Sequence, residues 1–149
     1  MTDRFFLGVV AGLAGAMAMV VLNFLLNLIP GVQMELIFGI SKLFVPQNLL
    51  GTLAGGTIGV IAHLICGGLA GLIFLVIMEK TGVNHPVLKG IVLGLAAWFL
   101  ANGIVGRILG LSMQDTFVDN IFIILVHAVF GIITAWIIAR YHPKTFAGT

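Results

Sequence analysis

Charge is the scarcest property of this sequence. Charged residues make up 8% of the chain and hydrophobic residues 60%, whereas a soluble domain usually carries about 25% charged residues. Only one cysteine is present, so no disulfide can form within the chain. The few lysines and arginines form no dense cluster, which argues against a phosphate-binding patch and a nucleic-acid partner. The alternation of polar and apolar residues that a membrane β-barrel needs is missing too.

Long apolar runs dominate the sequence instead. Four of them are long enough for a helix to cross a hydrocarbon core, which takes about 20 residues, and they cover approximately 5–29, 53–78, 87–111 and 120–139. The first run is too long for a cleaved signal peptide, whose apolar region has about 7–15 residues. The sequence therefore predicts an all-α integral membrane protein, a bundle of four transmembrane helices that forms one domain over residues 1–149.

The positions of the basic residues predict an orientation. Most of them flank the N-terminus, the connection between the second and third runs, and the C-terminus: Arg4, Lys80, Lys89, Arg140 and Lys144. Short loops that carry lysine and arginine stay on the cytoplasmic side of a membrane. We therefore expect both termini in the cytoplasm, with the lipid bilayer as the first partner of the chain.

The chain also contains an internal repeat. The segment GVVAGLA, which begins at Gly8, returns as GIVLGLA at Gly90. Because each repeat holds two apolar runs, both repeats enter the membrane in the same sense. We therefore predict a tandem duplication of a helical hairpin, in which unit one covers 5–86, unit two covers 87–143, and unit one carries an insertion at 31–48.

The insertion at 31–48 is too short, between its flanking prolines, to cross a membrane. A helix there would place Glu35 and Lys42, which are seven residues apart, on one face. We therefore expect a short interfacial helix between the first and second spanning helices, which shields the outer end of the bundle.

Histidine occurs twice inside the apolar runs, each time with a glycine four residues later. His63 is followed by Gly67, and His127 is followed by Gly131. At a rise of about 1.5 Å per residue, both histidines lie at a similar height in the outer half of the membrane. Because the second and fourth helices are diagonal partners in an up-down-up-down bundle, the two imidazoles are expected to face each other across the core. Ionisable residues at such a depth usually mark a functional site.

Two facing imidazoles are also the axial ligands of a b-type haem. One hypothesis is therefore a pocket for haem b, with His63 and His127 as iron ligands. The glycine that follows each histidine would leave space for an edge of the porphyrin. Asn102 in the third helix and Arg107 near its outer end would meet the propionates near the outer surface.

Helix packing is the simpler explanation of the same pattern. The glycines would let helix backbones approach closely, and each histidine would hydrogen-bond a neighbouring helix. A metal site that adds Cys66 to the two histidines reaches only three ligands, and no carboxylate lies at that depth. A transport path would require several copies of the chain, because four short helices enclose too little space.

Four segments carry a resemblance to known proteins: GLAGAMAMVVLNFLL, HLICGGLAGLIFLVIM, GIVLGLAAWFLANGIV and HAVFGIITAWII. With them the chain resembles an uncharacterised family of short prokaryotic four-span membrane proteins, in which a Gly-rich helix and a His-x-x-x-Gly helix occur twice. The matching positions are His63, Gly67, Trp98, His127 and Gly131. The resemblance implies this fold and a place in a prokaryotic cytoplasmic membrane, and it implies no reaction.

These observations together favour a role that is not catalytic. The first hypothesis is an accessory or scaffold subunit, which packs with itself as a homo-oligomer or joins a larger membrane complex. One alternative is a small b-type cytochrome that binds one haem between two histidines and transfers electrons. The other alternative is a small-solute transporter or channel assembled from several copies.

Overall fold

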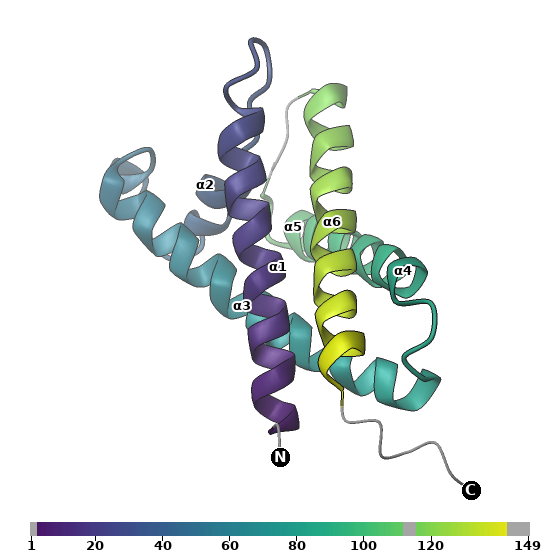
Figure 1. Cartoon of the computed structure of the whole chain (residues 1–149). Coiled ribbons are helices and arrows are strands. Elements are labelled where there is room, and N and C mark those ends of the chain that lie inside the picture. The colour runs from purple at the N-terminus through teal and green to yellow at the C-terminus, as the bar shows by residue number, and fades with distance from the viewer. Residues whose placement is uncertain (1–2, 112–115, 143–149) are drawn as a thin grey trace, which may run out of the picture.

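The computed structural model describes residues 3–111 and 116–142, and the chain is helical over most of these residues. Within these residues, four helices are long and apolar enough to cross a membrane (Figure 1). They are α1 (Arg4–Leu26), α3 (Leu53–Thr81), the third spanning helix Pro86–Ile108, and α6 (Phe117–Tyr141). The third spanning helix consists of α4 (Pro86–Trp98), the π-helical segment η2 (Phe99–Val105) and α5 (Gly106–Ile108). The short helices α2 (Leu36–Ser41) and η1 (Gln47–Leu49) lie between α1 and α3. The expected helical class is confirmed.

Polar residues at the helix ends explain where the long helices begin and stop. The side chain of Asp3 accepts a hydrogen bond from a backbone N–H in the first turn of α1, and Thr52 and Thr116 cap α3 and α6 in the same way. α3 ends at Gly82, whose φ of 80° suits glycine better than any other residue. Lys89 of α4 donates to two carbonyl oxygens at this end of α3 and so closes the turn between the two helices.

The long helices pack around α1 and α6. α1 lies against both α3 and α6, and Figure 1 shows α1 and α6 side by side in opposite directions while α3 crosses α1 obliquely. The third spanning helix packs through α4 against α6, and α2 packs against α3. α3 and α6 touch over a short stretch only, in keeping with diagonal partners. Because α4 lies along α6 rather than along α3, the ring of four helices stays incomplete on one side.

Glycines set the distance between the packed helices. A Cβ built on Gly12 of α1 would meet the backbone of Gly67 in α3 at under 3.0 Å. A Cβ built on Gly94 of α4 would likewise meet the backbone of His127 in α6, and Gly131 lies equally close to the backbone of α4. No side chain fits at these positions, so the small residues act as contact points at which two backbones approach closely.

Ion pairs bring the two described chain ends to one end of the molecule. The carboxylate of Glu79, near the end of α3, lies 3.7 Å from the guanidinium of Arg4 and 3.4 Å from the imidazole of His142. The start of α1 and the end of α6 therefore share one end, as an even number of spanning helices requires (Figure 1). Lys144 and the last residue of the predicted unit two, at 143, lie outside the described residues.

Side chains of α1 and α6 anchor the insertion at the opposite end. The amide of Asn27 exchanges two hydrogen bonds with the backbone of Met34, at 2.7 and 3.1 Å. Asp119, which is 1% exposed in the first turn of α6, accepts a hydrogen bond from the backbone N–H of Gln33 at 3.0 Å. The chain between α1 and α2 is thus tied to two helices before α2 begins.

The expected helix within the insertion is present as α2 and is shorter than the segment between the prolines. The ammonium of Lys42 lies 2.6 Å from the carboxylate of Glu35, which confirms that the two residues share a face. α2 packs against α3, and its Leu36 and Ile37 are buried there. The position of α2 at a membrane interface stays a prediction.

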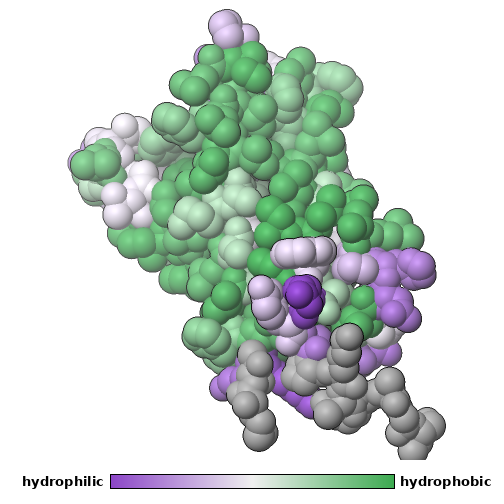
Figure 2. Space-filling model, in the orientation of Figure 1, coloured by the Kyte–Doolittle hydropathy of each residue, from purple (hydrophilic) through white to green (hydrophobic). Residues whose placement is uncertain are grey.

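The outer surface of the molecule is largely apolar. Figure 2 shows hydrophobic residues over most of the visible face, with hydrophilic residues gathered at the end that carries both chain ends. Large apolar side chains such as Ile73 and Leu125 are exposed, and in the third spanning helix only 11% of the most apolar window is buried. Exposed apolar surface of this extent is rare on soluble monomers, and it is consistent with a multi-pass membrane protein.

Candidate ligand-binding cavity

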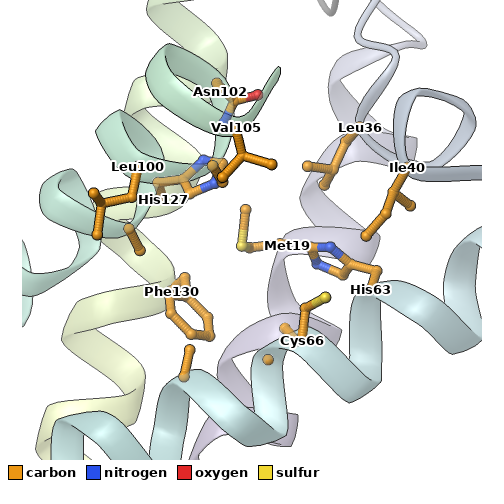
Figure 3. Close-up of a pocket in the computed structure, with 15 residues that line it drawn as sticks. Met19, Leu36, Ile40, His63, Cys66, Leu100, Asn102, Val105, His127 and Phe130 are labelled. Atoms are coloured by element: carbon orange, nitrogen blue, oxygen red, sulfur yellow. The ribbon is translucent and has the colours of Figure 1, made fainter. Parts of the chain in front are cut away.

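A cavity of about 350 Å³ lies on the side where the ring of helices is incomplete. α1, α2, α3, α6 and the third spanning helix all contribute to its wall (Figure 3). Its chemistry is set by a small group among the lining residues: Met19, His63, Cys66, Asn102, His127 and Phe130. The rest of the wall consists of alanine, glycine, leucine, isoleucine and valine. A mostly apolar wall with a few polar groups is typical of small-molecule sites, whose volumes begin at about 300 Å³.

His127 presents one free ring nitrogen to this cavity. Its imidazole is 7% exposed, and Nδ1 lies 2.7 Å from the backbone carbonyl oxygen of Ile123, one turn earlier in α6. A carbonyl oxygen only accepts hydrogen bonds, so Nδ1 carries the proton of the neutral ring and donates. Nε2, on the opposite edge of the ring, therefore holds a lone pair that is free to accept a hydrogen bond or to bind a metal.

His63 is the second buried imidazole of the cavity. It is 9% exposed, and its Nε2 is buried without a hydrogen-bond partner. Figure 3 shows the two imidazoles on facing sides of the cavity, with Met19 between them in this view. An unpartnered buried polar atom costs about 1–3 kcal/mol, so the His63 ring is destabilising unless something binds it.

The structure brings together four of the six residues expected in a haem pocket. His63, Gly67, Asn102 and His127 all line the cavity. Gly131 is not among the lining residues, since it faces the backbone of α4. Gly67 also packs against α1, where it meets Ala16 and Gly12. The close approach of helices is therefore the role that both glycines share.

Arg107 lies apart from the cavity. It is exposed in α5, beyond the π-helical segment, and does not contribute to the cavity wall. Asn102 sits within that segment, where its amide NH₂ donates to the backbone carbonyl of Trp98 at 3.4 Å. Trp98 packs against the core and leaves its buried Nε1 unpartnered, but it does not line the cavity. The cavity therefore has polar groups only around its two imidazoles, Asn102 and Cys66.

Sequence reasoning missed three parts of this site. Met19 is 2% exposed and fills space beside the imidazoles, yet its run of small and apolar residues carries no sign of that position. Leu36 and Ile40 extend from α2 into the wall, and their spacing of four residues on a short helix was the available signal. The π-helical segment has no recognisable signal in the sequence, although such segments frequently occur at functional sites.

A protein-only metal site finds no support in the described part of the chain. Over residues 3–111 and 116–142, no three residues among histidine, cysteine, aspartate and glutamate are grouped closely enough to hold a metal ion. Cys66 lines the cavity but is exposed, as a residue at its rim would be.

Comparison with known proteins finds no matching family model, no similar curated protein and no similar solved structure. The resemblance to the uncharacterised four-span family stays a prediction. The function of the cavity has to be inferred from its own chemistry.

Proposed function

We propose that this chain is a membrane protein without catalytic activity that binds a small, largely apolar molecule between its helices, as an accessory subunit would. The single observation that carries the proposal is that two buried imidazoles line one cavity of about 350 Å³, and that the buried Nε2 of one of them, His63, has no hydrogen-bond partner. A buried polar atom without a partner carries a desolvation penalty, and an apolar side chain of similar shape would remove that penalty. The unpartnered nitrogen of His63, on the wall of a cavity that a second buried imidazole also lines, is therefore best explained by a ligand that contacts the rings.

A transmembrane position with both termini in the cytoplasm is part of this proposal. Its support is the distribution of basic residues: Arg4, Lys80, Lys89 and Arg140 lie at or near the end that holds both described chain ends, and Lys42 and Arg107 lie elsewhere. Lysine and arginine accumulate on the cytoplasmic side. A fluorescent protein fused to either terminus should fluoresce, and alkaline phosphatase fused to either should stay inactive. Active phosphatase at one terminus alone would contradict the proposal.

The duplicated hairpin is also proposed here, and the glycine contacts support it. In the first hairpin Gly12 of α1 lies against Gly67 of α3. In the second hairpin the matching residue, Gly94, lies against His127, which is one helical turn before Gly131. Corresponding glycines thus mediate both contacts with a displacement of one turn. This arrangement suits two copies of one hairpin whose helices have slid by a turn relative to each other.

Haem is the second candidate ligand because the imidazoles of His63 and His127 lie on facing sides of the cavity (Figure 3). Three observations favour a smaller molecule. The cavity is at the low end of the size range of ligand sites. The buried side chain of Met19 lies beside the imidazoles. Gly131 does not line the cavity, and Gly67 and Gly131 both contact a neighbouring helix too closely to leave room for a porphyrin edge. We therefore rank an apolar molecule without a metal first.

A pair of adjacent alanines in α4 tests the proposed function. Ala97 lines the cavity, whereas Ala96 is exposed on the helix and does not line it. We expect that protein purified in native-lipid nanodiscs carries one small apolar molecule, which mass spectrometry detects after extraction. Ala97→Leu should remove this molecule because the larger side chain fills the cavity, and Ala96→Leu should retain it.

The outcomes of this experiment separate the candidates. Equal small-molecule content in the wild type and both variants would contradict a ligand in the cavity. A Soret band in the wild-type absorption spectrum, lost with Ala97→Leu, would assign the cavity to haem and overturn the preference for a metal-free ligand. Thermal unfolding of both variants in the same nanodiscs controls for loss of the fold.

A further inference from the structure

The free nitrogen of His127 limits which chemical groups the cavity accepts. Nδ1 donates to the carbonyl of Ile123, so Nε2 is an acceptor and needs a donor from the ligand. A ligand with only carbonyl or ether oxygens would place an acceptor against this acceptor. A ligand with a hydroxyl group supplies the missing donor.

The same hydroxyl group also suits His63. The buried Nε2 of His63 has no partner, and it either carries a proton or holds a lone pair, depending on the tautomer. A hydroxyl is one donor with two acceptor lone pairs, so it meets the ring in both tautomers. Asn102 donates one N–H of its NH₂ group to the carbonyl of Trp98, which leaves its second N–H as a donor and its side-chain oxygen as an acceptor. A hydroxyl group, which both donates and accepts, can pair with either.

The cavity opens between α3 and η2, on the lateral surface of the helix bundle. Its wall includes Cys66 of α3 and Leu100 and Val105 of η2, and all three are exposed. His63 lies about 24 Å from Glu79 along α3, at 1.5 Å per residue, and about 15 Å from the other end of that helix, so it sits well inside the spanning segment. In a bilayer this opening faces lipid, and a ligand reaches it from the hydrocarbon region.

We propose that the cavity takes apolar molecules that carry a hydroxyl group, such as phenols or alcohols, which enter from the bilayer between α3 and η2 and donate a hydrogen bond to Nε2 of His127. The apolar wall holds the body of the molecule, and the imidazoles select for its hydroxyl. This inference rests on the proposed function, and it adds the chemical class of the ligand.

Two probes of nearly the same shape test the inference. Thymol has a phenolic hydroxyl, and its methyl ether has an ether oxygen in the same place. Binding of each to wild-type protein in nanodiscs is measured by NMR of isotope-labelled histidine and is corrected for partition into the lipid. We expect thymol to bind at least about tenfold more tightly than the ether and to shift the Nε2 resonance of His127, because only thymol forms the hydrogen bond.

The outcomes distinguish this inference from the proposed function. If both probes bind equally, the cavity takes small molecules but does not select a hydroxyl, and the inference is wrong. If neither probe binds, the cavity does not take small apolar molecules of this size, and the proposed function is contradicted as well. His127→Phe should markedly reduce the preference for thymol, while both probes still bind. The comparison of probes in the wild type stays decisive even if this variant does not fold.

Discussion

Gly131→Ala is expected to destabilise the protein by about 3 kcal/mol, at the upper end of the usual cost of overpacking. A Cβ at Gly131 would collide with the backbone of α4, lying 2.8 Å from the backbone nitrogen of Gly94 and closer still to the carbonyl oxygen of Gly90. Backbone atoms cannot move aside as a flexible side chain does, so α4 and α6 have to separate. Unfolding by titration with dodecyl sulphate in bicelles measures the change.

Gly68→Ala is the matched control for this prediction. Gly68 is also a buried helical glycine, but the nearest neighbours of its added Cβ are side-chain atoms at 3.6–3.9 Å, which is ordinary contact. Alanine also has the higher helix propensity, so we expect a gain of about 0.5 kcal/mol in the free energy of unfolding. Equal effects of the two substitutions would show that helix packing is not the role of Gly131.

His63→Leu is expected to uncouple stability from ligand binding. In protein stripped of its ligand, leucine should raise the free energy of unfolding by about 1 kcal/mol, because it removes a buried nitrogen that has no partner. The same substitution should abolish retention of the ligand in native-lipid nanodiscs. A residue that costs stability and serves binding is typical of a functional site.

His127→Leu serves as the comparison for this second prediction. Nδ1 of His127 donates to the carbonyl of Ile123, and Nε2 of His127, unlike that of His63, is not a fully buried atom without a partner, so the replacement should give no such gain in stability. Ligand retention should still fall, because the acceptor Nε2 is lost. If the ligand-free His63→Leu protein unfolds more easily than the wild type, the imidazole has a structural partner and its proposed role in binding is wrong.

The fold could be predicted from the sequence because its main signals are compositional. The four apolar runs became four helices of spanning length, and the ends of α3 and of the third spanning helix fall within a few residues of the expected limits. The similar depth of His63 and His127 followed from helical rise alone, and both residues do line one cavity. Helical periodicity is regular, so counting residues along a helix locates a side chain well.

The placement of individual site residues could not be predicted, because it depends on the tilt of each helix and on its rotation about its axis. Arg107 was expected beside the cavity, but the π-helical segment lies before it, and Arg107 is exposed outside the cavity wall. Gly131 was expected either at a porphyrin edge or at a helix contact. The structure places it against the backbone of α4, which the sequence alone does not reveal. Such placement depends on tertiary contacts between residues that are far apart in sequence.

The widened turn at Phe99–Val105 has one more consequence for the third spanning helix. A π turn holds an extra residue, so every side chain beyond it is rotated out of phase with the glycine face that contacts α6. Within this turn, Asn102 and Val105 line the cavity. Gly90 and Gly94, which precede the turn, contact the backbone of α6. Deleting a single residue from the turn would restore regular α-helical phase. The residues of the third spanning helix that follow the deletion would then rotate about the helix axis and no longer face the cavity.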